Sequence, residues 1–111
     1  MLVEIYYSYS QVVAVQELLF EMKSLPFNAY SVEHKITISL SNHLFKVFDK
    51  KVRALEIKPN ILIGNKEYKI KLCYHEVIGL LNICMEGFSL VKTERAKNNL
   101  QMVINKLDEN K

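Results

Sequence analysis

The chain has 111 residues, of which 50% are hydrophobic and only five are Gly or Pro, and its net charge is +3 at pH 7. This composition excludes a disordered chain and a loop-rich disulfide scaffold, and the length predicts one domain, residues 1–111, with its own core. The first residues do not resemble a secretory signal, and the most apolar run is too short to span a bilayer. The sequence therefore predicts a cytoplasmic protein with two reduced cysteines and no membrane partner.

The N-terminal part of the sequence predicts a strand, a helix and a second strand. Residues 2–9 alternate apolar and polar positions, as in a half-buried strand, and Ser10 is placed to cap the helix that follows. That helix ends before Pro26. Residues 34–41 predict a second strand, whose alternating apolar residues are Ile36, Ile38 and Leu40.

Residues 42–58 fit two different structures. As a helix, the segment starts at a cap on Ser41 or Asn42, stops at Pro59 and has one apolar face. The residues of this face are Leu44, Phe48, Val52 and Leu55. The alternative is a hairpin that turns through residues 49–51, but this turn has neither Gly nor Asn. We therefore prefer the helix.

A hairpin is the strongest local prediction. Gly64 and Asn65 separate two short apolar runs, and both residues accept the positive φ angles of tight turns. The alternation predicts that one face of the second run is buried, namely Tyr68, Ile70 and Leu72. The register stays open, because the turn can be centred on residues 64–65 or on residues 65–66 with the same face buried.

Two helices are predicted after the hairpin, at residues 75–86 and 89–108. Gly87 suits the end of the first and Ser89 the N-cap of the second. A core-facing seam is expected along the last helix: Thr93, Ala96, Leu100, Val103 and Leu107. Met102 lies off this seam, so the helix is a candidate homodimer contact. The predicted fold class is α+β: a small antiparallel sheet that includes a hairpin at residues 61–72, covered by helices, with two C-terminal helices.

The positive charge is concentrated in the middle of the chain. Residues 43–72 contain eight Lys or Arg and three Asp or Glu, a net charge of 8 − 3 = +5, whereas residues 1–42 carry −2 and residues 73–111 are balanced. A row of fixed cations binds a polyanion by releasing its counterions. The candidate phosphate contacts are Lys46, Lys50 and Arg53 on the helix and Lys66, Lys69 and Lys71 on the hairpin.

The order helix, strand, helix, hairpin is similar to that of a winged-helix module, in which a recognition helix precedes a two-stranded wing. This analogy of element order implies DNA as the favoured partner. Tyr6, Tyr7 and Tyr9 are candidate base-stacking residues, although packing in the sheet is the more ordinary role for aromatic residues on a strand. An accessory or regulatory nucleic-acid-binding protein is the function that the sequence favours.

The sequence is weighed against two other functional classes, an enzyme or metal site and a protein-interaction module. Catalysis by a nucleophile requires an oriented base, and the cysteines and histidines show no such local signature, so we expect no enzyme, metal or cofactor. The close Cys/His group consists of Cys73, His75 and Cys84, which is short of the four paired ligands of a structural zinc site. The main alternative is a protein-interaction module or inhibitor whose basic patch docks on an acidic partner.

Overall fold

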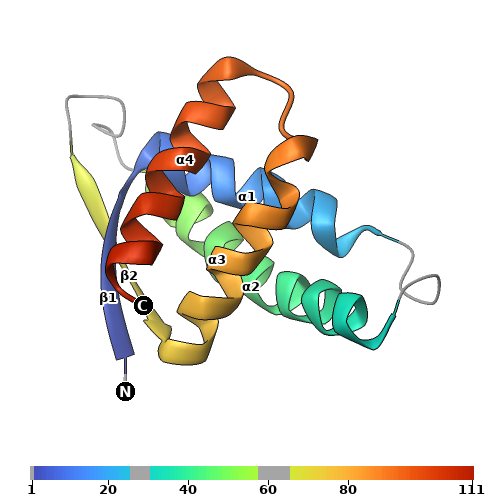
Figure 1. The fold of residues 1–111 in the computed structure, drawn as a ribbon. Coiled ribbons are helices and arrows are strands. Elements are labelled where there is room, and N and C mark those ends of the chain that lie inside the picture. The colour runs from blue at the N-terminus through green and yellow to red at the C-terminus, as the bar shows by residue number, and fades with distance from the viewer. Residues whose placement is uncertain (1, 26–30, 58–65) are drawn as a thin grey trace.

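The computed structural model describes residues 2–25, 31–57 and 66–111, and these residues form an α+β fold with a two-stranded antiparallel sheet and four α-helices (Figure 1). The elements are β1 (Leu2–Ser8), α1 (Tyr9–Lys23), α2 (Val32–Glu56), β2 (Glu67–Cys73), α3 (Tyr74–Gly87), a 3₁₀ turn (Phe88–Leu90) and α4 (Glu94–Glu109). The sheet lies at one edge of the molecule, and the helices pack on one side of it (Figure 1). The predicted fold class is confirmed.

The two strands pair along their whole length. Ile5 lies opposite Ile70 and Tyr7 opposite Tyr68, so that these four side chains share the inner face, and all four are buried. Leu72 is buried on the same face, as the alternation predicted. The second strand of the predicted hairpin is therefore β2, and the partner that the structure describes for it is β1. The first strand and the turn of that hairpin lie outside the described residues.

The cap of α1 differs from the prediction. The strand ends at Ser8, and the Ser8 Oγ accepts a hydrogen bond from the Gln11 N–H at 3.2 Å. The Gln11 Oε1 accepts one in return from the Ser8 N–H at 3.1 Å. Ser10 was the wrong choice, because the chain already has helical geometry at Tyr9 and only the residue before the first turn can reach its free N–H groups.

The predicted strand at residues 34–41 is wrong, and so is the predicted helix start at Ser41 or Asn42. Both lie within α2, a single helix of 25 residues with Ser31 as its N-cap. The buried positions of α2 are spaced three and four apart: Ile38, Ser41, Leu44, Phe48, Val52 and Leu55. Ile36 is 63% exposed, so the alternation of apolar residues in this stretch does not mark a sheet face. The helix predicted for residues 42–58 is confirmed as far as Glu56, and the hairpin alternative is excluded.

The C-terminal helices are confirmed, but their junction is not as predicted. A 3₁₀ turn follows α3, and Thr93 rather than Ser89 caps α4, since the Thr93 Oγ1 accepts from the Ala96 N–H at 3.1 Å. Gly87 is the last residue of α3, where a Cβ atom would lie 2.6 Å from a methyl carbon of Leu18. The expected seam of α4 is fully buried at three positions: Leu100, Val103 and Leu107.

The core lies between the inner face of the sheet and the helices. Tyr7 and Phe48 meet there, with ring centroids 6.1 Å apart.

Both cysteines are free thiols, and burial raises the pKa of Cys84 to about 12. Among the described residues, no helix is both long enough and apolar enough to cross a membrane.

Candidate nucleic-acid interface

The structure places five of the six predicted phosphate contacts on α2 and β2 and the sixth directly before β2. Lys46, Lys50 and Arg53 are on α2, whereas Lys66 immediately precedes β2 and Lys69 and Lys71 lie within it. All six side chains are exposed. The α2 row and the β2 row are therefore both accessible to a ligand.

The α2 row contains two unpaired cations and one paired cation. Lys46 and Lys50 form no ion pair with any described residue. In contrast, the Arg53 guanidinium lies 2.9 Å from the Asp49 carboxylate, which also accepts a hydrogen bond from the Gln16 amide at 2.8 Å. Both bonds lower the pKa of Asp49, and the hydrogen bond from Gln16 has the larger effect. Arg53 is thus partly neutralised by its own helix.

The β2 row faces an acidic residue on the neighbouring strand. Glu4 on β1 lies opposite Lys71, and its carboxylate oxygen is 3.9 Å from the ammonium groups of both Lys69 and Lys71. Exposed ion pairs of this length contribute at most about 1 kcal/mol. Two lysines that share one carboxylate keep a net charge of +1, and a phosphate oxygen can replace the carboxylate at little cost.

An exposed aromatic side chain lies beside these lysines on the outer face of the sheet. Tyr6 is directly opposite Lys69 and is 49% exposed. The Lys106 ammonium of α4 donates to the Tyr6 carbonyl at 2.7 Å, which ties this part of β1 to the helix. Tyr7 is buried, and the Tyr9 hydroxyl donates to the Glu56 carboxylate at 3.4 Å. Of the three candidate base-stacking tyrosines, Tyr6 therefore has the most accessible position.

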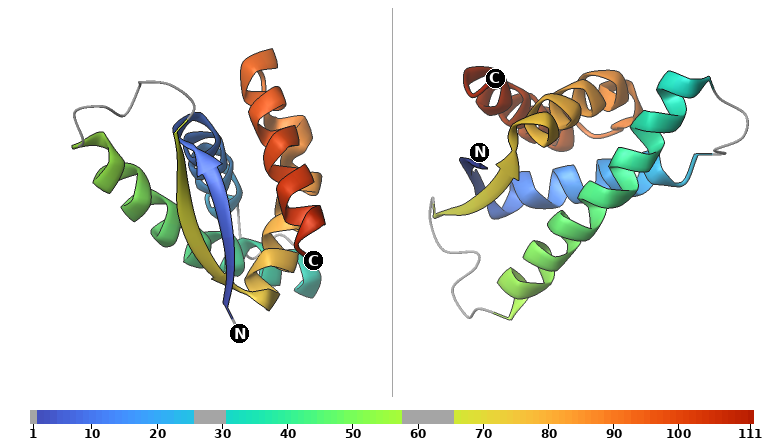
Figure 2. Two further views of the ribbon diagram at one scale, coloured as in Figure 1. Left: turned by 90° about the vertical axis from the view of Figure 1, so that its left-hand side faces the viewer. Right: turned by 90° about the horizontal axis from the view of Figure 1, so that it is seen from below.

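The bond between Tyr9 and Glu56 also relates the two rows of cations. It places the C-terminal end of α2 next to the end of β1, and β2 begins at that end because Ser8 lies opposite Glu67. In the left view of Figure 2, the strands lie between α2 and α4, and the C-terminal end of α2 points away from them. The end of the α2 row at Arg53 and the start of the β2 row therefore lie toward the same end of the sheet.

A second polar cluster joins α2 to α3. The Glu76 carboxylate lies 2.9 Å from the His43 Nε2 and accepts a hydrogen bond from the Cys73 N–H at 2.7 Å. Burial alone would raise the pKa of Glu76, but the bonds from Cys73 and His43 outweigh it and hold the pKa below its ordinary value. The cluster anchors the first turn of α3. No group of three His, Cys, Asp or Glu side chains in the described parts of the chain is arranged to hold a metal ion.

The element order behind the winged-helix analogy is absent, because the segment predicted as its strand belongs to α2. Comparison of the chain with models of protein families, with curated proteins and with solved structures found no match.

The homodimer through α4 stays a prediction. Met102, which was expected off the buried seam, is 51% exposed.

Proposed function

We propose that this protein is a non-enzymatic nucleic-acid-binding protein, accessory or regulatory in role, with DNA as the favoured ligand. Its contact surface comprises Tyr6 and the six candidate phosphate contacts: Lys46, Lys50, Arg53, Lys66, Lys69 and Lys71. The observation that supports this proposal most directly is the position of Tyr6 opposite Lys69 on the open face of the sheet.

Cations beside an exposed aromatic ring can bind a single-stranded nucleic acid. Lysines bind successive phosphates through released counterions, and an unstacked base lies on an aromatic ring. Side chains directly opposite each other on an antiparallel sheet have Cβ atoms about 5 Å apart. Tyr6 can therefore contact a base, and Lys69 the adjacent backbone, of the same stretch of single-stranded nucleic acid. We accordingly propose a preference for single strands over duplex.

Little sequence specificity is expected from this surface. Base edges are read mainly by Arg, Asn and Gln side chains, whereas lysine contacts to phosphate fix position alone. Arg53 is the one arginine among the six residues, and it is held by Asp49. Affinity should therefore depend on strand length and salt more than on base order.

The test compares affinities for a labelled single-stranded oligonucleotide and for its duplex at several salt concentrations. A Lys69→Gln/Lys71→Gln variant should bind the single strand more weakly, and its log–log salt slope should fall by about 1.4, because each phosphate contact contributes about 0.7. The matched control, Lys92→Gln/Lys97→Gln, removes two charges near the start of α4 and should retain the wild-type slope. Equal slopes for all three proteins would contradict the proposal and favour the alternative, docking on an acidic protein.

A further inference from the structure

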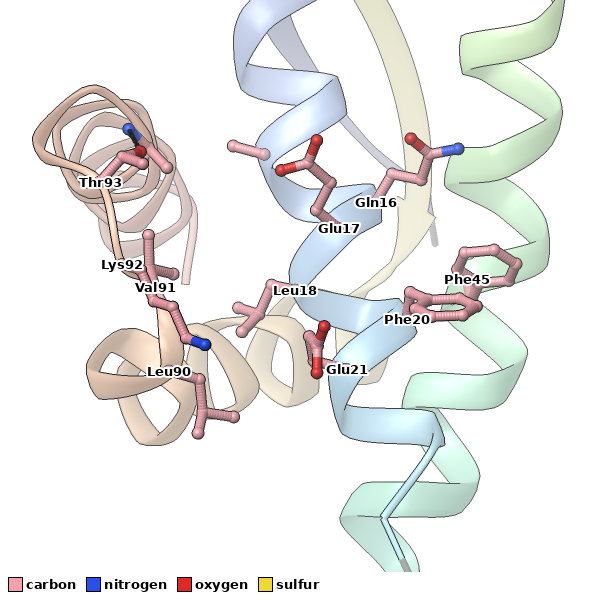
Figure 3. A pocket seen from close by; sticks show the side chains of 12 residues that line it. Gln16, Glu17, Leu18, Phe20, Glu21, Phe45, Leu90, Val91, Lys92 and Thr93 are labelled. Carbon is pink, nitrogen blue, oxygen red and sulfur yellow. Dashed lines mark hydrogen bonds between the residues drawn. The ribbon is translucent and has the colours of Figure 1, made fainter.

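A hollow lies between α1 and the segment that joins α3 to α4 (Figure 3). Figure 1 shows that this segment lies away from the sheet. Its volume is about 680 Å³, within the usual range of ligand sites. Its lining is mostly apolar: the buried Ala14 and Leu18 form the floor, Leu90, Val91 and Ala96 lie on one side, and Phe20 and Phe45 lie at one end. Phe20 and Leu90 are exposed although both are large and apolar.

The hollow extends along α1. A smaller depression of about 290 Å³ continues it toward Tyr9 and shares four lining residues with it: Ala14, Glu17, Thr93 and Ala96. Together the two line α1 from Tyr9 to Glu21, a length of about 18 Å at 1.5 Å per helical residue. This apolar groove is long enough for about three turns of a partner helix.

The two banks of the groove carry opposite charges. Glu17 and Glu21 are exposed on α1, one helical turn apart, and neither forms an ion pair with a described residue. In Figure 3 both side chains project from the same side of α1 as Leu18. Two carboxylates at this spacing repel each other on an isolated helix, so a cation between them would relieve the repulsion. Lys92 and Arg95 lie on the opposite bank.

The end of the groove shows that a cation is accommodated there. The rings of Phe20 and Phe45 lie with centroids 5.9 Å apart, and the Lys23 ammonium is 4.9 Å from the centroid of Phe45 and 5.3 Å from that of Phe20. Lys23 already occupies the aromatic pair, so the part of the groove left for a partner's cations is the part beside Glu17 and Glu21.

We propose that this groove binds an amphipathic helix of a partner protein, with its apolar face on Leu90 and Val91 and with Lys or Arg residues, spaced i and i+4, against Glu17 and Glu21. An apolar groove between helices is a common site for such a segment, and the spacing of the two carboxylates sets the spacing of the partner's cations. None of the six candidate phosphate contacts lines the groove, although Phe45 of α2 directly precedes Lys46.

The proposal can be tested with a fluorescein-labelled helical peptide of about 14 residues, long enough to fill the groove. It carries leucines along one face and two lysines one turn apart on one flank. Fluorescence anisotropy should show binding of roughly micromolar affinity. A control peptide with glutamates in place of the lysines should bind at least about fivefold more weakly at low salt, as expected for the loss of two exposed ion pairs.

Variants of the protein test the same contacts from the other side. Glu17→Gln/Glu21→Gln should weaken binding of the lysine peptide about fivefold and abolish its preference over the glutamate peptide. The charge-matched control, Glu86→Gln/Glu109→Gln, should retain the wild-type affinity. Ala96→Phe, which fills the groove, should weaken binding more than about tenfold, as expected when apolar contacts are blocked. Circular dichroism verifies that each variant is folded.

Three results would overturn the proposal. The first is equal binding of both peptides by the wild type, and the second is equal binding of the lysine peptide by the wild type and by Ala96→Phe. The third is that NMR shifts of residues 14–21 and 90–96 change with the concentration of the protein alone, because a second copy of this chain would then occupy the groove. None of these results bears on the binding of single-stranded DNA by Lys69 and Lys71.

Discussion

The imidazole of His43 on α2 lies 2.9 Å from the carboxylate of Glu76 on α3. The same carboxylate accepts a hydrogen bond from the Cys73 N–H at the start of α3. These two bonds stabilise the ionised form of Glu76 and lower its pKa, although burial acts in the opposite direction. A carboxyl whose pKa is lower in the folded state stabilises the fold above its unfolded pKa, near 4.5, and loses that contribution as the pH falls toward the folded value.

The first prediction concerns this pH dependence. The free energy of unfolding of the wild type should fall as the pH is lowered from about 5 toward 3, and part of this fall should be absent in Glu76→Gln. Glutamine keeps an oxygen that accepts the Cys73 N–H, so the variant should still fold. Urea unfolding at several pH values measures the difference. Parallel pH profiles for the two proteins would show that Glu76 does not titrate differently on folding.

The second prediction concerns the hydroxyl of Tyr7. It is buried and has no hydrogen-bond partner among the described residues, and burial raises the pKa of Tyr7. An unsatisfied buried polar group costs about 1–3 kcal/mol, so Tyr7→Phe should be as stable as the wild type or more stable by about 1 kcal/mol. Denaturant unfolding tests this. A loss of more than 1 kcal/mol in Tyr7→Phe would mean that the hydroxyl does have a partner.

The third prediction separates the two candidate caps of α1. Ser8→Ala removes the bond to the Gln11 N–H and should cost about 1 kcal/mol, whereas Ser10→Ala should change stability by a few tenths. The two substitutions have the same chemistry, and they differ in position by two residues. A larger loss for Ser10→Ala would restore the cap that the sequence suggested.

The fourth prediction concerns the inner face of the sheet. Ile70 is 4% exposed and lies opposite Ile5, so Ile70→Ala should cost about 2–5 kcal/mol through lost burial and a cavity. The neighbouring residue, Lys69, points to the outer face, and Lys69→Ala should change stability by no more than about 0.5 kcal/mol. Similar losses for both variants would contradict the register.

Local patterns in the sequence correctly predicted the elements whose own periodicity defines one buried face. The alternation of Tyr68, Ile70 and Leu72 and the helical spacing of Leu100, Val103 and Leu107 each follow from a single buried face. Residues 34–41 are different, because Ile36 and Ile38 are β-branched and alternate although they lie on a helix. There the cap at Ser31 and the packing of one continuous stripe from Ile38 to Leu55 outweigh the local preference for a strand.

The candidate site was less predictable, since its chemistry depends on pairs that are distant in sequence. The basic residues were visible as a local excess of charge, and all six are exposed. The role of Glu4 was not visible, because it follows from the pairing of β1 with β2. The same pairing places Tyr6 beside Lys69. The groove could not be predicted either, since it is formed by α1, residues 90–96 and Phe45 of α2.

The last prediction separates base stacking from phosphate binding on the outer face of the sheet. If a base stacks on Tyr6, Tyr6→Ala should weaken binding of a single-stranded oligonucleotide by about 1–3 kcal/mol. The salt slope should stay the same, because no charge is removed. Tyr6→Phe keeps the ring and should retain most of the affinity. Tyr6 is half-exposed, so both variants should fold, and circular dichroism verifies this. Wild-type affinity in Tyr6→Ala, together with a reduced salt slope in Lys69→Gln/Lys71→Gln, would mean that the protein binds phosphates without stacking a base on this ring.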